Sequence, residues 1–110
     1  LTVASEIEKR NLLRNVRERG AQLREGLNRL VDHFPNYLEG SRGWGLLQGL
    51  VFKEDCGITA VDVVKAALEE QLLVVPAGAQ VVRMVPALVI NAREIQVLLT
   101  RLERALNRVS

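Results

Sequence analysis

The sequence predicts an α+β fold, a mostly antiparallel sheet covered by helices on one face. Three stretches carry apolar residues three and four positions apart, four short glycine-rich or β-branched stretches lie between them, and the order is helix, strand, strand, helix, strand, strand, helix. The 110 residues are 48% hydrophobic and 25% charged, which suits one domain with its own core. Residues 1–110 are therefore expected to form a single domain.

The first helix is expected over Ser5–Phe34. Its first residue and Glu8 match a capping box, and Pro35 follows its end. Gly20 and Gly26 lie inside it and each cost about 1 kcal/mol relative to alanine, so a bend or close packing against a neighbour is expected there. The apolar stripe consists of Ile7, Leu12, Leu13, Val16, Leu23, Leu27, Leu30, Val31 and Phe34.

Residues 39–53 lack helical spacing and contain four glycines, so they are expected to form one or two strands. Glycine in a strand often marks a bulge or the close approach of another backbone. Trp44 lies among these glycines and is expected to pack within the strand. A polar turn at residues 54–57 ends this part of the sheet.

The second helix is expected to start after Thr59, with Asp62 completing the cap, and to end near Gln71. Its expected apolar face consists of Val63, Val64, Ala67 and Leu68. Leu72–Val75 and Val81–Val85 follow as two β-branched runs around a short loop with glycine, which predicts a hairpin.

Pro86 ends the second run, and residues 88–90 are expected to reach the last helix in extended form. Asn91 and Glu94 repeat the capping signature. The stripe of this helix consists of Ile95, Leu98, Leu99, Leu102, Ala105, Leu106 and Val109.

Charge and cysteine content restrict the class of protein. The net charge is +2, and the six arginines between Arg10 and Arg29 alternate with glutamates and have no aromatic residue among them, which is typical of a solvated helix face. No apolar run approaches the roughly 20 residues that span a bilayer. Neither a nucleic-acid nor a membrane partner is expected. With Cys56 as the only cysteine, no intrachain disulfide can form, and a cytoplasmic setting is expected.

Few side chains have the chemistry that catalysis needs. His33 is the only imidazole and stands at the expected end of a helix. Cys56 follows two carboxylates, which disfavour a thiolate. The only lysines, Lys9, Lys53 and Lys65, lie where exposed helix surfaces or strand ends are expected. One histidine and one cysteine cannot complete a zinc site. No catalytic, cofactor-binding or metal-binding residue is predicted in the chain.

Arg83 stands out because it lies inside an apolar strand. Alternation places it on the same face as Val81 and Val85. If that face is buried, the guanidinium needs a carboxylate, from the protein or from a ligand. The spacing alone favours a structural or edge-exposed position.

Four ordered blocks resemble the C-terminal region of class III, pyridoxal-phosphate-dependent aminotransferases: Arg42–Leu50, Leu72–Gly78, Val82–Ile90 and the helix containing Glu94. The resemblance extends over nearly the whole chain. It implies the C-terminal small domain of a fold-type I pyridoxal-phosphate-dependent transferase, packed on a larger domain that binds the cofactor. The lysine that holds the cofactor would lie in that domain, and the whole enzyme would be a homodimer. A first residue other than Met also suggests a processed or cut product.

The resemblance also implies a role for Arg83, which begins the family's Arg-x-x-Pro-x-Leu block. In the family this arginine binds a carboxylate of the amino-acid substrate, usually the α-carboxylate. The implied substrates are an amino acid and a 2-oxo acid. Overall similarity favours N-acetylornithine and 2-oxoglutarate, with ornithine, 4-aminobutyrate and succinylornithine as alternative donors.

Two positions depart from the family pattern. Gln71 replaces the usual glycine at a helix end, and Ala87 replaces a common second proline, so the geometry of both loops is open. A different class of function is a free-standing, non-enzymatic interaction module whose helices present an apolar surface. That class accounts for the lack of catalytic groups but not for Arg83.

Overall fold

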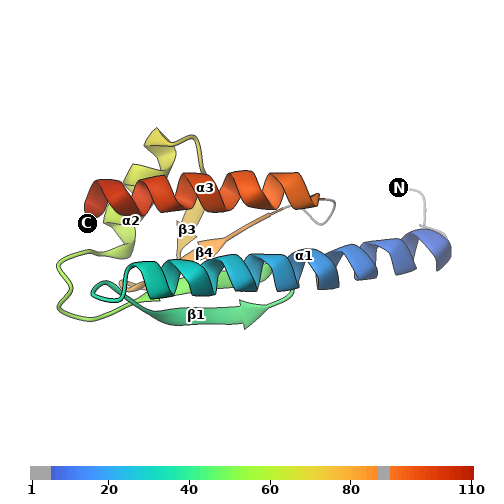
Figure 1. Cartoon of the computed structure of the whole chain (residues 1–110), viewed down its shortest axis with the longest axis horizontal. Coiled ribbons are helices and arrows are strands. Elements are labelled where there is room, and N and C mark those ends of the chain that lie inside the picture. The colour runs from blue at the N-terminus through green and yellow to red at the C-terminus, as the bar shows by residue number, and fades with distance from the viewer. Residues whose placement is uncertain (1–5, 87–89) are drawn as a thin grey trace.

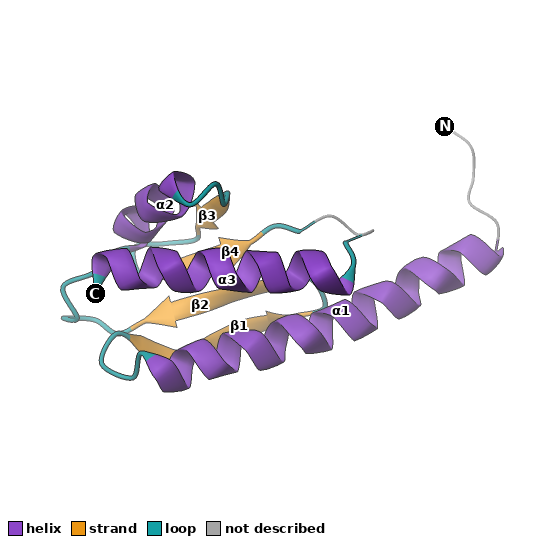
Figure 2. Cartoon of the chain, turned by 45° about the horizontal axis from the view of Figure 1, so that its top comes forward, coloured by secondary structure: helices purple, strands orange, loops and turns teal. Residues whose placement is uncertain are grey.

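The computed structural model describes residues 6–86 and 90–110 as three helices and one four-stranded sheet. The elements are α1 (Glu6–His33), β1 (Leu38–Trp44), β2 (Leu47–Phe52), α2 (Ala60–Glu69), β3 (Val74–Pro76), β4 (Val81–Met84) and α3 (Ala92–Val109). All strand pairs are antiparallel, in the order β1-β2-β4-β3. Helices α1 and α3 lie side by side over one face of the sheet (Figures 1 and 2). The expected α+β architecture is confirmed.

Capping boxes start both shorter helices, as expected. At α2 the Thr59 hydroxyl accepts from the Asp62 N–H, and the Thr59 N–H donates to the Asp62 carboxylate at 3.0 Å. These hydrogen bonds to Thr59 lower the pKa of the Asp62 carboxyl. At α3, Asn91 and Glu94 make the same pair of bonds, at 2.8 and 3.1 Å.

Two expectations fall on residues outside the described part of the chain. They are the cap at Ser5 and most of the extended stretch at residues 88–90.

The glycine-rich stretch forms two strands, not one. β1 and β2 pair from Trp44↔Leu47 to Leu38↔Phe52, with a register shift between Leu38 and Gly40. Gly45, in the turn, has a φ of 61°, a left-handed conformation that favours glycine. The predicted hairpin of β3 and β4 is also present.

The expected apolar face of α2 is wrong at its C-terminal end. Leu68 is 55% exposed, whereas Ala60, Val63 and Ala66 are buried with Ala67. Leu68 therefore lies on the side of α2 that faces away from the core, although the same turn buries Ala66 and Ala67. The helix ends at Glu69, two residues earlier than expected. Gln71 then adopts a φ of 61°, the left-handed conformation that the family's usual glycine adopts easily.

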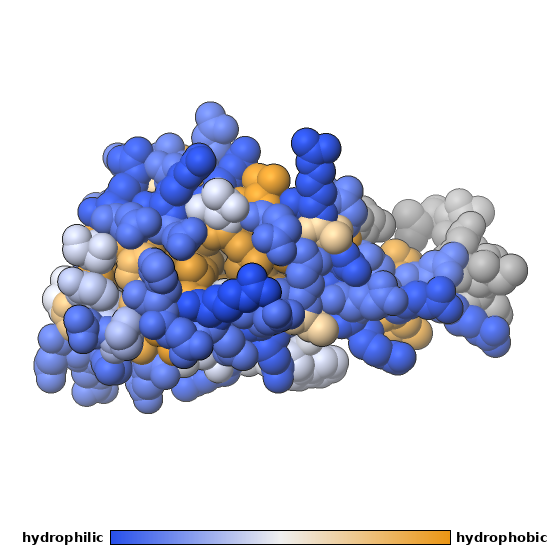
Figure 3. Space-filling view, in the orientation of Figure 1, coloured by the Kyte–Doolittle hydropathy of each residue, from blue (hydrophilic) through white to orange (hydrophobic). Residues whose placement is uncertain are grey.

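The core lies between the sheet and the helices. Its fully buried members include Leu23 and Leu27 of α1, Leu50 of β2 and Leu102 of α3. Apolar side chains show in the seam between α1 and α3, whereas polar ones cover the outer sides of both helices (Figure 3). The N-terminal half of α1 extends beyond the sheet, and Leu13 of the expected stripe is exposed there.

Both glycines inside α1 are sites of close packing, as expected. A Cβ on Gly20 would lie 2.6 Å from the carbonyl oxygen of Gly45, and a Cβ on Gly26 would overlap the side chain of Leu99. Larger residues would therefore push α1 away from the hairpin turn and from α3.

Candidate substrate-binding face

Strand β4 divides its side chains between the two faces of the sheet. Val82 and Met84 are fully buried beneath the helices, and Arg83 between them is exposed. Sequence alternation therefore predicted correctly that Arg83 points away from these neighbours. We call the face that points away from α1 and α3 the open face. It includes Arg42, Trp44, Leu47, Gly49, Val75 and Arg83.

Strand register places two arginines in one row of the open face. Arg42 is opposite Gly49, Gly49 is opposite Arg83, and Arg83 is opposite Val75. Directly opposed residues of antiparallel strands point to the same face. Since neighbouring strands lie about 4.8 Å apart, the Cα atoms of Arg42 and Arg83 are about 10 Å apart, with Gly49 between them.

Gly49 holds these strands close together. A Cβ at this position would lie 2.6 Å from the carbonyl oxygen of Val82 on β4. Gly49 itself is buried although it carries no side chain. Glycine here meets the expectation that a strand glycine marks the close approach of another backbone.

Both arginines of the row are exposed, and no described carboxylate forms an ion pair with either of them. Within residues 6–86 and 90–110, neither Arg42 nor Arg83 makes a hydrogen bond or ion pair through its side chain. By contrast, Arg19, Arg29 and Arg108 each pair with a glutamate. The open face therefore presents guanidinium groups that no described carboxylate neutralises.

Apolar side chains surround the two arginines. Leu47 is 70% exposed and Trp44 is 81% exposed, and Val75, Val85 and Leu73 are exposed as well. A charge-assisted hydrogen bond is stronger where apolar groups exclude water, so a ligand carboxylate held at this face under cover would bind strongly. The expectation that Trp44 packs within a strand is wrong, because its position at the end of β1 falls on the open face.

A groove adjoins this face between α1 and the β1–β2 turn. Its volume is about 490 Å³, and Trp44, Leu13 and Arg17 line it. Gln48 forms its inner wall and is only 2% exposed. The amide of Gln48 donates to the carbonyls of Gly20, at 2.7 Å, and of Gly45, at 2.5 Å. This buried amide joins the turn to α1.

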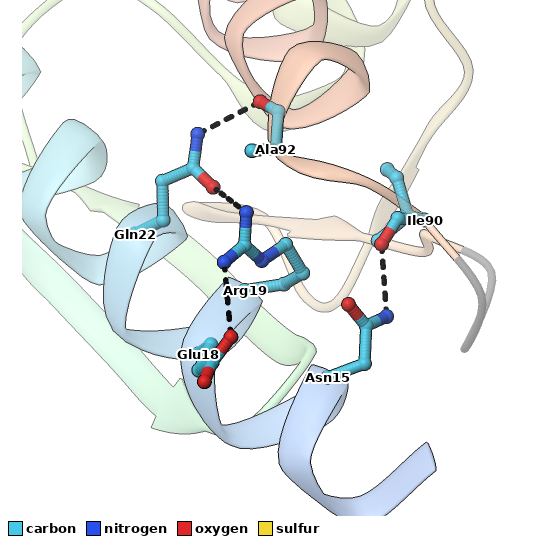
Figure 4. A network of polar contacts seen from close by, with 6 residues as sticks. All are labelled: Asn15, Glu18, Arg19, Gln22, Ile90 and Ala92. Carbon is cyan, nitrogen blue, oxygen red and sulfur yellow. Dashed lines mark hydrogen bonds and ion pairs between the residues drawn. The ribbon is translucent and has the colours of Figure 1, made fainter. Parts of the chain in front are cut away.

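A second set of polar contacts ties α1 to the start of α3 (Figure 4). Asn15 donates to the Ile90 carbonyl and Gln22 to the Ala92 carbonyl, both at 2.8 Å. Arg19 donates to the side-chain oxygen of Gln22 at 3.1 Å. The chain after β4 is therefore anchored to α1, while β4 itself is held between β2 and β3. Arg83 thus stands on a strand that is fixed on both sides.

The remaining candidates from the sequence do not assemble into a reactive site. His33 is exposed and makes an edge contact with Phe34. Cys56 is half-buried, and its thiol donates to the Ile58 carbonyl at 3.4 Å. The three lysines are exposed on separate segments.

The described residues contain no group of three or more metal-ligating His, Cys, Asp or Glu side chains. None of the helices that the structure describes is long and apolar enough to cross a membrane.

Sequence reasoning identified Arg83 but missed Arg42, Gly49 and Gln48. Cross-strand register brings the first two beside Arg83, and a single sequence does not specify that register. Gln48 carried a local signal, since it is a polar residue at an inward position of a strand that also contains Leu50 and Phe52.

Comparison with known proteins gives a consistent result. The model of the class-III aminotransferase family matches residues 1–106. The acetylornithine aminotransferases of Parasynechococcus marenigrum and Prochlorococcus marinus are 59% and 60% identical over 96% of this chain. The chain spans only about a quarter of the length of these relatives, 25% in both cases.

Solved structures show the same likeness. The N-acetylornithine aminotransferase of Stenotrophomonas maltophilia matches 89% of this chain with a TM-score of 0.81 and 32% identity, over 27% of its own length. The ornithine aminotransferase of Toxoplasma gondii matches 94% of the chain with a TM-score of 0.82 and 29% identity, over 24% of its length.

Proposed function

Because the chain belongs to the class-III aminotransferase family, we propose that it is the C-terminal small domain of an acetylornithine aminotransferase, in which Arg83 binds a substrate carboxylate. The sequence relatives at 59% and 60% identity carry that name. Their fourfold greater length supports a larger enzyme of which this chain is one part. One observation carries the site: an exposed arginine without a described partner on the open face of the sheet.

The whole enzyme would transfer an amino group reversibly between N-acetylornithine and 2-oxoglutarate, as a step of arginine biosynthesis. It would act as a homodimer, as the family resemblance implies, and in the cytoplasm, as the single cysteine suggests. Ornithine remains a second candidate donor, because an ornithine aminotransferase matches the fold as well as an acetylornithine enzyme does. The sequence identities favour N-acetylornithine.

Class-III aminotransferases use pyridoxal phosphate as the electron sink that makes amino transfer possible. The described residues do not fit this cofactor, which needs a lysine inside a pocket. Lys9, Lys53 and Lys65 are all exposed and lie on α1, after β2 and on α2. We therefore assign cofactor binding to the large domain outside this chain, which also makes the chain inactive alone. Contacts with that domain would cover part of the apolar open face.

In this proposal Arg83 holds the substrate by its carboxylate and orients it. A guanidinium presents its N–H groups in a planar fork that matches a carboxylate at two points, which fixes the direction of the ligand as well as its place. The fixed position of β4 in the sheet limits the arginine's movement, and an oriented substrate reacts faster than a loosely held one. The absence of a described internal partner leaves the fork free for the ligand.

The free-standing interaction module fits the structure less well. That alternative needs helices that present an apolar surface, whereas α1 and α3 bury most of their stripes against the sheet and each other. The exposed apolar side chains of the helices are spread over all three of them: Leu13 on α1, Val61 and Leu68 on α2, and Val97 on α3. On the open face, by contrast, Trp44, Leu47 and Val75 are exposed on three strands of one sheet.

Replacing Arg83 by alanine in the complete enzyme tests the proposal. We expect kcat/KM to fall by the equivalent of about 2–5 kcal/mol, the usual loss for one partner of a buried charge pair. The absorbance of the bound cofactor should stay unchanged. The matched control is Arg104→Ala on the exposed side of α3, which should keep the wild-type kcat/KM. An unchanged kcat/KM for Arg83→Ala would contradict the proposed role.

A further inference from the structure

We propose that Arg101 of α3 is a positioning residue for substrate binding. It holds Gln71 in the left-handed conformation that ends α2, and it thereby fixes strand β3 beside Arg83. The link to the substrate rests on the proposed function of Arg83, whereas the contact between Arg101 and Gln71 does not. Arg101 compensates in this chain for the glycine that Gln71 replaces.

The end of α2 has the hydrogen bonds of a Schellman motif. The Leu72 N–H donates to the Ala67 carbonyl at 2.8 Å, and the Gln71 N–H donates to the Leu68 carbonyl at 3.0 Å. This motif places the residue after the cap in the left-handed conformation, and Gln71 has a φ of 61°. Glycine adopts that conformation readily, whereas a Cβ makes it unfavourable. Gln71 therefore strains this corner in a way that a glycine would not.

A contact from α3 opposes this strain. The guanidinium of Arg101, which is half-buried, donates to the carbonyl oxygen of Gln71 at 2.9 Å. The bond depends on the direction of that carbonyl, which would turn if Gln71 left the left-handed conformation. Its donor is charged, and such hydrogen bonds are roughly twice as strong as neutral ones. The left-handed conformation of Gln71 therefore gains the free energy that this bond contributes.

A second arginine of α3 holds the residues that precede Gln71. Arg108 pairs with Glu69 at 2.9 Å and with Glu70 at 2.6 Å. Arg101 and Arg108 are seven positions apart, close to two turns, so both point to the same side of α3. Arg108 binds side chains, whereas Arg101 binds the backbone of the residue with the positive φ. We therefore assign the compensating role to Arg101.

The corner at Gln71 leads directly into β3, the strand beside Arg83. β3 is three residues long, lies at the edge of the sheet and ends in Pro76, which has no N–H to donate. It pairs with β4 through Val75, directly opposite Arg83. So short a strand makes few ladder hydrogen bonds of its own, and its place depends on the corner before it. A shift of β3 would displace Arg83, and a displaced binding group orients its ligand less well.

Amide hydrogen exchange in the complete enzyme tests the contact itself. Arg101→Met removes the donor but keeps an apolar stem, and Arg104→Met is the matched control on the exposed side of α3. Relative to intrinsic rates, exchange at residues 71 and 72 should accelerate about threefold to tenfold in Arg101→Met and stay unchanged in the control. Adding Gln71→Gly to Arg101→Met should restore the wild-type protection, because glycine keeps a positive φ without this bond.

Steady-state kinetics of the same variants test the link to the substrate. In Arg101→Met the KM for N-acetylornithine should rise about twofold to tenfold while kcat stays within about twofold of wild type. A merely structural defect would instead reduce the fraction of active enzyme, which lowers the apparent kcat and leaves KM unchanged. Gln71→Gly should return the KM of Arg101→Met to the wild-type value.

The outcomes separate this inference from the proposed function. Unchanged exchange in Arg101→Met, or faster exchange that Gln71→Gly does not restore, would overturn the role of Arg101 at Gln71. Faster exchange with an unchanged KM, or an equal rise of KM in Arg104→Met, would overturn its positioning role. An Arg83→Ala enzyme with wild-type kinetics would overturn the proposed function itself.

Discussion

The two faces of the sheet use the same strands for different purposes. On the face beneath α1 and α3, Leu50, Val82 and Met84 are fully buried in the core. On the open face, Arg83 and Leu47 are exposed within the same two strands. One strand therefore contributes to stability with one residue and offers a binding group with the next.

This difference follows from the alternation of side chains along a strand. A one-residue slip of β4 would bury Arg83 and expose Val82 and Met84. The core would then lose two apolar side chains, and a charge would be buried without a partner. The buried face thus holds Arg83 in register, and the open face is free to vary around it. Truncation of a side chain should lower stability on the covered face and substrate use on the open face.

The largest expected effect on stability is at Leu50, on the covered face. Leu50→Ala should lower the free energy of unfolding by about 2–5 kcal/mol, because it removes buried methyl groups and leaves a cavity. Leu47→Ala, three residues away on the open face, should change it by at most about 0.5 kcal/mol. Urea unfolding of this 110-residue chain measures both. Equal losses would break the contrast between the faces.

A smaller effect is expected where the two central strands approach each other. Gly49→Ala places a Cβ 2.6 Å from the Val82 carbonyl oxygen, and separating β2 from β4 should cost about 1–3 kcal/mol. Gly40→Ala is the control on β1, since a Cβ there meets no atom within 4 Å. Its free energy of unfolding should equal or slightly exceed that of wild type. If urea unfolding gives the same free energy of unfolding for both variants, the fold does not depend on the close approach of β2 and β4 at Gly49.

The smallest effect is expected from pH at the start of α2, away from the open face. Hydrogen bonds to Thr59 hold the pKa of the Asp62 carboxyl below its ordinary value of 3.8. A lowered folded pKa stabilises the fold above that ordinary value, and this contribution disappears as pH falls through the folded value. Amide hydrogen exchange at the first turn of α2 should therefore accelerate below about pH 4 relative to the intrinsic rate of an unstructured chain at the same pH.

The control for this pH effect is Asp62→Asn. The variant keeps a hydrogen-bonding side chain but has no carboxyl to titrate, so the acceleration should be smaller. An acceleration of equal size in both proteins would show that another group is responsible.

Much of the fold was predictable because its signals are local. Capping residues such as Thr59 and Asn91 lie three positions from their partners, and the hairpin of β3 and β4 joins two neighbouring runs. The wrong predictions concern residues whose burial depends on segments that are distant in the sequence. Leu68 follows the helical spacing of α2, but its side chain is exposed, whereas Ala66 and Ala67 of the same turn are buried.

The candidate site was predictable only in part for the same reason. Arg83 is conspicuous within an apolar strand, yet its spacing does not say which face the helices cover. Arg42 and Gly49 become part of the site through the register of three strands. Trp44 is exposed because the open face continues to the end of β1.

The most direct test of this account is a crystal structure of the complete enzyme with 2-oxoglutarate bound. The account predicts one carboxylate within about 3 Å of the Arg83 guanidinium, on the open face of the sheet. A structure in which Arg83 pairs with a protein carboxylate, and the ligand lies away from this face, would contradict it.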